Sequence, residues 1–253
     1  MAVNVTHAMF IQPPDENIKI WRYMSFTKLV SLLESSCLYF SRADKLGDPF
    51  EGSWPRINVS ARLEVPDGIP EGLHASYKES MKNLSEITKK WPKHIAVNCW
   101  HMNEHESAAM WKLYMQGNEG IAIQSTYKKL KDSLIDEEQI FLGLVRYINY
   151  QTEWIYASNM FSPFMHKRKS YEHEREVRAL IVKMPTTGDK IDYSKESISN
   201  GIIIKVDMGI LIEQIYVAPY CPDWFEDLVR SIVVKYGFSF KIVHSGLDDP
   251  PLF

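Results

Sequence analysis

The periodicity of apolar and polar residues changes repeatedly along this chain, which indicates many short strands and helices. Residues 18–24 alternate between apolar and polar side chains, the period of a strand with one buried face. Beyond Ser25, a residue type that begins helices, apolar side chains recur at helical spacing from Phe26 to Leu33. The same patterns predict further strands at residues 38–41, 95–100, 121–124, 141–148, 176–182, 202–206, 215–218 and 238–244, and helices at residues 74–91, 107–115, 127–134, 164–173 and 222–236.

The order of these elements predicts the fold class. Strands and helices interleave, but a full crossover helix does not separate every pair of strands, so a doubly wound parallel sheet is disfavoured. We expect an α+β fold with a central mixed or antiparallel sheet flanked by helices. Residues 1–17 carry no regular pattern and are expected to form an N-terminal arm, which leaves residues 18–253 as a single domain.

Composition narrows the possible partners. The chain has 253 residues, 45% of them hydrophobic, which is enough to bury a substantial core. The formal net charge is -3, whereas duplex-binding proteins usually carry a basic excess, so nothing requires a nucleic-acid partner. Two short basic clusters, at residues 128–131 and 166–169, are interpreted as solvated helix faces. The oligomeric state is left open.

Cysteine usage and hydropathy indicate a cytoplasmic protein. Cys37, Cys99 and Cys221 form no C-x-x-C pair, and the odd count argues against a disulfide framework. Cys37 and Cys99 lie in apolar segments, so both are expected to be buried and unpaired. No segment approaches the ~20 apolar residues of a membrane span, and no signal peptide is apparent. No membrane partner is therefore expected.

A first candidate site lies at the start of the strand predicted at residues 176–182. Glu174, Glu176 and Arg178 are two residues apart, so the period of a strand places them on one face. One interpretation is a solvated strand end with local Glu–Arg pairing. The other is a paired-carboxylate site, because clustered carboxylates with a nearby cation are typical of functional sites.

Arg22 is the second candidate, because it interrupts an otherwise apolar strand between Trp21 and Tyr23. An arginine in such a strand needs an anionic partner, either a protein carboxylate or a ligand phosphate. The loop that contains Asp48 and Glu51 is expected to return to the same cleft, because one helix and one short strand connect it to Arg22.

Other kinds of site are disfavoured. The sequence contains no G-x-G-x-x-G and no G-x-x-x-x-G-K-[ST], which excludes the usual dinucleotide and P-loop folds. Cys99, His101 and His105 lack the paired ligand spacing of a zinc site, so no metal is expected. Lys167 and Arg168, taken with the acidic loops, leave a metal-dependent nuclease as an alternative.

Long segments of the chain resemble a prokaryotic family, the domain of unknown function 2971. The resemblance is carried by WRYMSFTKLVSLLESSCLYFSRADKLGDPFEGSW, VNCWHMNEHESAAMWKLYMQGNEGIAIQST and FMHKRKSYEHEREVRALI, and it extends from about Ile18 to Leu252. It implies no activity, because the family's function is unassigned.

A second resemblance is to ADP-ribosyltransferases of the Arg–Ser–Glu type, which carry three motifs in a fixed order. Arg22 stands on an early strand, Ser125 and Thr126 at the end of a later one, and Glu174-Arg175-Glu176 at the start of a third. Tyr127 stands where that family's middle motif has a second serine. The resemblance implies an ADP-ribosyltransferase-like fold, with NAD as the substrate.

The same resemblance implies a role for each residue. Arg22 would hold the NAD pyrophosphate, Tyr23 would stack on a ring, and Ser125 with Thr126 would shape the nicotinamide-ribose pocket. Glu176 would stabilise an oxocarbenium-like transition state, as carboxylates do in glycoside cleavage, and Glu174 would orient or deprotonate the acceptor. Asp48, Glu51, Arg178 and Lys167 are further candidates for the same site.

These observations lead to one functional hypothesis and two rivals. The leading hypothesis is an NAD-binding ADP-ribosyltransferase or NAD glycohydrolase, for which a toxin or phage-defence system would be a fitting setting. One rival is a non-catalytic module that binds a nucleotide or a protein. The other is a metal-dependent nuclease or phosphoesterase.

Overall fold

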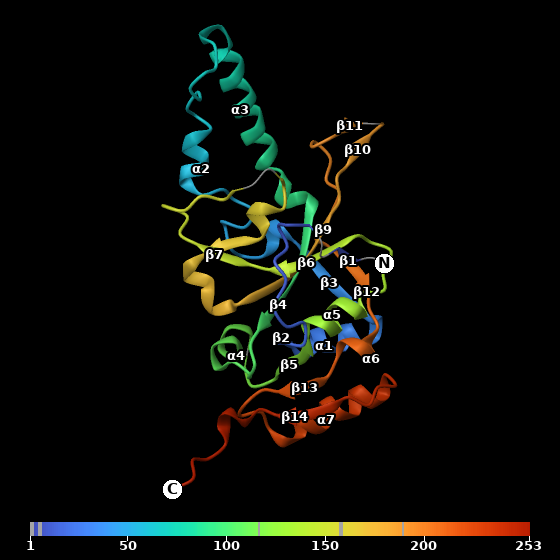
Figure 1. Cartoon of the computed structure of the whole chain (residues 1–253). Coiled ribbons are helices and arrows are strands. Elements are labelled where there is room, and N and C mark those ends of the chain that lie inside the picture. The colour runs from blue at the N-terminus through green and yellow to red at the C-terminus, as the bar shows by residue number, and fades with distance from the viewer. Residues whose placement is uncertain (1–2, 5–6, 116, 157–158, 189) are drawn as a thin grey trace.

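A twisted mixed sheet forms the centre of the computed structural model, which describes residues 3–4, 7–115, 117–156, 159–188 and 190–253 (Figure 1). Along its main path the strands are β1 (Val3–Asn4), β6 (Ile140–Leu144), β9 (Glu176–Val182), β4 (Ile95–Met102), β2 (Lys19–Ser25), β5 (Gly120–Thr126), β13 (Gln214–Val217) and β14 (Lys241–His244). Off this path, β12 (Gly201–Lys205) pairs with β3 (Cys37–Arg42), which in turn pairs with β4. The β1–β6 and β13–β14 pairs are parallel and the other pairs are antiparallel, so the predicted α+β fold with a mixed sheet is confirmed.

The sheet divides along one edge of β4, because two strands share that edge. Near the end of β4, β2 pairs only through Ile20 with Met102 and Trp21 with His101. Near its beginning, β3 pairs only through Ser41 with Val97 and Arg42 with Ala96. Residues 98–100 of β4 therefore have no ladder partner on this side among the described strands. We call the opening between β2, β3 and residues 98–100 the fork.

Side chains at the fork satisfy some of the backbone groups that strand pairing leaves free. The Asn98 side chain donates to the Tyr39 carbonyl of β3 at 2.9 Å. The Arg22 guanidinium of β2 donates to the Cys99 carbonyl at 3.2 Å. Buried backbone groups rarely stay unpaired, so these two contacts stabilise the divergence of β2 and β3.

Helices cover the two faces of the sheet unequally. One face packs against α1 (Phe26–Ser35), α5 (Tyr127–Ser133), α6 (Met208–Leu211) and α7 (Asp223–Lys235), which contribute Leu29, Leu130, Met208 and Phe225 to the largest apolar cluster (Figure 1). On the other face α4 (Ala108–Tyr114) packs against Trp21 and Tyr23, and a separate cluster joins Phe164 to Leu180. The fork thus opens between two packed layers.

Smaller elements extend away from the sheet. The helices α2 (Arg56–Ala61) and α3 (His74–Thr88) form an arm that projects from the body in Figure 1, and the sequence pattern missed α2. Two small pairs complete the fold: β7 (Arg146–Ile148) with β8 (His166–Arg168), which are parallel, and β10 (Thr186–Thr187) with β11 (Lys190–Ile191), which are antiparallel.

Three expectations about local structure are corrected. The helix predicted at residues 164–173 is strand β8 followed by a 3₁₀ turn over Lys169–Glu174, because pairing with β7 overrides a polar segment that has no apolar stripe. The strand predicted at residues 141–148 is interrupted at Val145, whose N–H donates to the Glu176 carbonyl. The expected N-terminal arm instead packs on the sheet: β1 pairs with β6, and Phe10 is buried.

Candidate functional site

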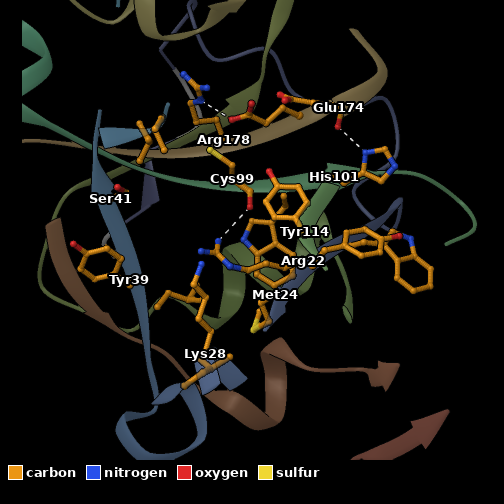
Figure 2. Close-up of a pocket in the computed structure, with 18 of the residues that line it drawn as sticks. Arg22, Met24, Lys28, Tyr39, Ser41, Cys99, His101, Tyr114, Glu174 and Arg178 are labelled. Atoms are coloured by element: carbon orange, nitrogen blue, oxygen red, sulfur yellow. Dashed lines mark hydrogen bonds and ion pairs between the residues drawn. The ribbon is translucent and has the colours of Figure 1, made fainter. Parts of the chain in front are cut away.

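A cavity of about 630 Å³ occupies the fork, within the usual size range for small-molecule sites. Its walls come from strands β2, β3, β4, β8, β9 and β12, from helices α1 and α4, and from the 3₁₀ turns that carry Lys45 and Glu174, so segments far apart in sequence meet there. The polar and aromatic side chains of the lining include Arg22, Tyr23, Lys28, Tyr39, Ser41, Lys45, Cys99, His101, Tyr114, Lys167, Glu174, Glu176 and Arg178. Figure 2 shows part of this lining.

Arg22 lies inside this cavity without a protein carboxylate. Its guanidinium contacts the Cys99 carbonyl and lies 5.7 Å from the centroid of the Trp100 ring. No carboxylate of the described residues forms an ion pair with it, and burial lowers the pKa of Arg22. The structure therefore does not support the protein salt bridge that the sequence left open, and it leaves an anion-binding group facing the cavity.

Two lysines extend this positive end. Lys28 of α1 and Lys45, in the turn after β3, line the same cavity, and Figure 2 shows Lys28 on the side of Arg22. Within the described part of the chain neither lysine forms an ion pair with a carboxylate. Arg22 and Lys28, neither of which pairs with a carboxylate of the described residues, make one end of the cavity electropositive, and Lys45 adds positive charge to the lining.

Glu176 lies toward the other end of the cavity, in a buried ionic network. Its Oε1 accepts from Arg178 Nε at 2.7 Å, so the predicted placement of these two side chains on one face of β9 is confirmed. Arg178 is fully buried and binds Glu51 through both terminal nitrogens, at 2.6 and 3.2 Å. It also donates to the Phe164 carbonyl. Arg178 thus fixes Glu176 from behind, while Glu51 does not line the cavity.

Lys167 joins the two candidate glutamates. Its Nζ donates to Glu174 and lies 3.2 Å from Glu176 Oε2. The Lys167 side chain is only 10% exposed, so the basic cluster at residues 166–169 is not the solvated helix face that its composition indicated. The network therefore contains three carboxylates, of Glu51, Glu174 and Glu176, against two cations.

A left-handed residue brings Glu174 to this site. Arg175 has φ 40°, a conformation that a side chain other than glycine adopts with strain, and it turns the chain from a 3₁₀ turn into β9. The turn is held by His101, whose Nδ1 donates to the Glu174 carbonyl at 2.6 Å, and by Met102 N–H, which donates to the Arg175 carbonyl. Glu174 therefore reaches the cavity through a backbone kink rather than through strand alternation.

The network keeps Glu176 ionised. Burial opposes ionisation, but the adjacent Arg178 and Lys167 outweigh it and lower the pKa of Glu176 to about 2. Tyr114, which points into the cavity in Figure 2, has its pKa raised to about 12 by burial and by nearby carboxylates, so its phenol stays protonated. The cavity thus offers a permanent carboxylate at neutral pH.

Ser125 and Thr126 lie outside the cavity, contrary to the role expected for them. Ser125 is fully buried, and its hydroxyl donates to the Leu211 carbonyl at 2.5 Å. Thr126 caps α5, with its hydroxyl accepting from Lys129 N–H at 3.1 Å. Ser125 pairs with Ile20, whose side chain belongs to the apolar cluster beneath α1, so the register directs the serine into that layer.

The substitution Ser125→Ala distinguishes a structural role of Ser125 from a role in the ligand pocket. Replacing Ser125 with Ala leaves the Leu211 carbonyl without its hydroxyl donor, so we expect the free energy of unfolding to fall by about 1–3 kcal/mol. The affinity of the cavity for its ligand should not change. Chemical denaturation of Ser125→Ala measures the free energy of unfolding, and ligand titration measures the affinity. A large loss of affinity would show that Ser125 belongs to the site.

Of the other residues expected at the site, some line the cavity and some lie outside it. Tyr23 lines the cavity, although its hydroxyl is engaged by Ser107 N–H at 2.7 Å. Asp48 lies outside and pairs with Arg168 at 2.9 Å, so the acidic loop approaches the site but only Glu51 reaches its network. Cys37 and Cys99 are free but partly exposed, so their expected full burial is wrong.

Sequence reasoning did not assign Lys28, Lys45, His101 or Tyr114 to this site. Tyr114 is the last residue of a short helix, directly after Leu113, and nothing local to Lys28 or Lys45 distinguishes them from solvated lysines. His101 was considered only as a metal ligand.

Among the described residues, no group of three or more His, Cys, Asp or Glu side chains is placed to hold a metal ion. No helix in the described ranges combines the length and hydropathy needed to cross a bilayer.

Comparison with known proteins yields only remote similarity. No family model matches the chain, so the resemblance to the domain of unknown function 2971 gains no support there, and no curated protein matches it. Among solved structures, Thermus sp. 2.9 DarT in complex with ADP-ribosylated ssDNA is similar at 10% identity, with 92% of this chain and 96% of that chain covered and a TM-score of 0.40. DarT from the same source in complex with NAD+ gives 11% identity, coverage of 91% and 96%, and a TM-score of 0.41. Similarity at this level carries no argument about this chain.

Proposed function

We propose that this protein binds NAD in the fork cavity and cleaves the bond between nicotinamide and ribose, passing the ADP-ribose to an acceptor or to water. One observation carries the proposal: the cavity has an unpaired cationic end at Arg22 and a permanent carboxylate, Glu176, toward the other end. NAD has the matching distribution of charge, with two phosphates on one side and a positively charged pyridinium ring on the other.

The cationic end suits the pyrophosphate. The guanidinium of Arg22 is planar and charged, its donors match the geometry of phosphate oxygens, and no carboxylate of the described residues competes for it. Lys28 and Lys45 add charge without fixed geometry, because both are exposed at the edge of the cavity. We therefore assign phosphate orientation to Arg22 and electrostatic attraction to the two lysines.

The carboxylate end suits the reacting ribose. When the glycosidic bond breaks, positive charge develops on the ribose ring, and a fixed carboxylate stabilises that charge without reorganising. Glu176 is held by Arg178 Nε and ionised at neutral pH, so it is prepared for this task before the ligand arrives. The half-exposed Tyr114 and the buried Tyr23 offer rings against which nicotinamide can stack.

Glu174 is placed to serve the acceptor. Lys167 donates to its Oε2, and the other oxygen has no hydrogen-bond donor among the described residues. An acceptor hydroxyl or a water beside Glu176 could pass its proton to that free oxygen as the new bond to ribose forms. The DarT structures were solved with NAD+ and with ADP-ribosylated ssDNA. For this chain, nucleic acid is one acceptor class to assay beside water.

The direct test measures NAD binding and nicotinamide release by the wild-type protein. Calorimetric titration with NAD should give saturable binding, and ADP-ribose should compete because it retains both phosphates. Nicotinamide release, followed by chromatography with water, protein and single-stranded DNA as acceptors, should depend on the wild-type protein. Absence of both binding and release would contradict the proposal.

The two rival functions give different results in the same assay. A non-catalytic nucleotide-binding module would bind NAD through Arg22 and release no nicotinamide with any acceptor. A metal-dependent nuclease would degrade nucleic acid only with added Mg²⁺ or Mn²⁺ and lose that activity with a chelator. Nicotinamide release that is insensitive to chelator favours the proposal over both.

A further inference from the structure

We infer that Lys167 is a positioning residue that keeps the Glu174–Glu176 pair doubly ionised by balancing its charge. This role deepens the proposed function, because a carboxylate that took up a proton could no longer stabilise positive charge on a ribose. Lys167 was named from the sequence only as a further candidate for the site, and the structure gives it a specific position between the two glutamates.

The contacts of Lys167 bridge two carboxylates that no other cation joins. Its Nζ donates to Glu174 Oε2 and lies 3.2 Å from Glu176 Oε2. Its side chain is 10% exposed, and the ammonium lies 5.0 Å from the centroid of the Tyr171 ring. Strand β8 carries Lys167 and is fixed by its parallel pairing with β7. The ammonium is therefore held in place rather than drawn from solvent.

Arg178 cannot take over this role. Its two terminal nitrogens bind Glu51, and one of them also donates to the Phe164 carbonyl. Only Nε faces Glu176. Within the described residues, Lys167 is thus the cation that Glu174 and Glu176 share, and the five charges of the network sum to one negative charge.

The remaining titratable groups around Glu176 supply no positive charge. Cys99 of β4, Tyr147 of β7 and Tyr114 of α4 lie near it, and burial raises the pKa of each, so all three are neutral at neutral pH. His101 of β4 pairs with Glu176 along the ladder, and burial lowers its pKa, which favours the neutral ring. Glu51 approaches from the loop after β3 and binds the terminal nitrogens of Arg178, and burial raises the pKa of Glu51. Without Lys167, three carboxylates would face one arginine.

Neutralising Lys167 should therefore make the pair take up a proton at higher pH. Two carboxylates that share a site cannot both ionise easily, and losing an adjacent opposite charge raises a carboxyl pKa by about 1–3 units. In Lys167→Met we expect the lower-pH limb of nicotinamide release to move to higher pH by that amount. Lys167→Arg retains the charge and should keep the wild-type limb.

A direct titration separates this inference from the proposed function. Carbon-13 NMR of glutamate carboxyl groups, from below pH 2 to pH 8, reports the pair whether or not the protein cleaves NAD. We expect one carboxyl of Lys167→Met to titrate about 1–3 units above its wild-type counterpart. Lys169→Met is the matched control, because Lys169 is 60% exposed and pairs with Glu153 outside the cavity.

A double variant tests the charge count itself. Lys167→Met combined with Glu174→Gln removes one charge of each sign, so the network keeps one net negative charge. Glu176 should then titrate close to its wild-type position, and the protein should regain any stability lost in the single variant. Superimposable titrations of wild type and Lys167→Met would overturn the inference. A double variant that titrates like the single variant would also overturn it.

Discussion

Replacing Glu176 with Gln should slow nicotinamide release by about 10²–10³-fold, the usual loss when one preorganised electrostatic group is removed from an active site. The change preserves shape and removes the charge that would stabilise the ribose in the transition state. Affinity for NAD should change little, because this contact strengthens only as positive charge develops. Single-turnover release and calorimetric affinity, measured on the same preparation, separate the two quantities.

Glu51→Gln is the matched control for that experiment. Glu51 binds the same Arg178 and is equally buried, but it does not line the cavity. We expect Glu51→Gln to lower the unfolding temperature, as Glu176→Gln will, because each removes a carboxylate from buried Arg178. Its rate per folded molecule should stay much closer to wild type. Equal losses of rate in the two variants would show that Glu176 acts only through the stability of the network.

Replacing Arg22 with Met should weaken NAD binding and stabilise the protein. A hydrogen bond from a charged group contributes about 1.5–3 kcal/mol, which corresponds to a Kd for NAD about 10–100-fold higher. The variant also loses the hydrogen bond to the Cys99 carbonyl, but it removes a desolvated guanidinium that has no carboxylate partner among the described residues. We expect the second effect to be larger, so the unfolding temperature should rise. A residue whose loss costs affinity and adds stability is serving a ligand rather than the fold.

Arg42 provides the control for this second prediction. It is a buried arginine of the same sheet, but it pairs with Asp44 at 2.7 Å and with Glu196 at 3.3 Å and lies outside the cavity. Arg42→Met should lower the unfolding temperature and leave NAD affinity unchanged. If Arg22→Met lowers the unfolding temperature as much as Arg42→Met does, Arg22 is a structural residue and the phosphate assignment fails.

Local patterns in the sequence were sufficient for most of the fold. The strand at residues 176–182 and the helix that begins after Ser25 appear where alternation and helical spacing placed them. The errors fall where tertiary pairing outweighs local preference, as in β8, which pairs with β7 through a segment of polar residues. Phe10, in a segment without a regular pattern, is likewise buried by a tertiary contact, because its ring stacks on Phe141 of β6.

The candidate site was less accessible to sequence reasoning. Arg22 could be singled out as a charge in an apolar strand, but whether it had a partner depended on distant carboxylates. Ser125 stood in the right order along the chain, yet the register of β5 against β2 directs it into the apolar layer. Lys167 lies in a basic cluster that resembles many solvated ones, and only the kink at Arg175 brings Glu174 to it.

The fork also allows the two walls of the cavity to change independently during evolution. Glu176 stands on β9 and Tyr39 on β3, and these strands pair with opposite edges of β4. Tyr39 and Ser41 can therefore change to fit a different base or sugar while the ionic network behind Glu176 stays intact. Substitutions on β3 can change which ligand the cavity binds, and substitutions on β9 can change the reaction that the ligand undergoes. Related proteins with this fold can therefore diversify in ligand and in chemistry separately.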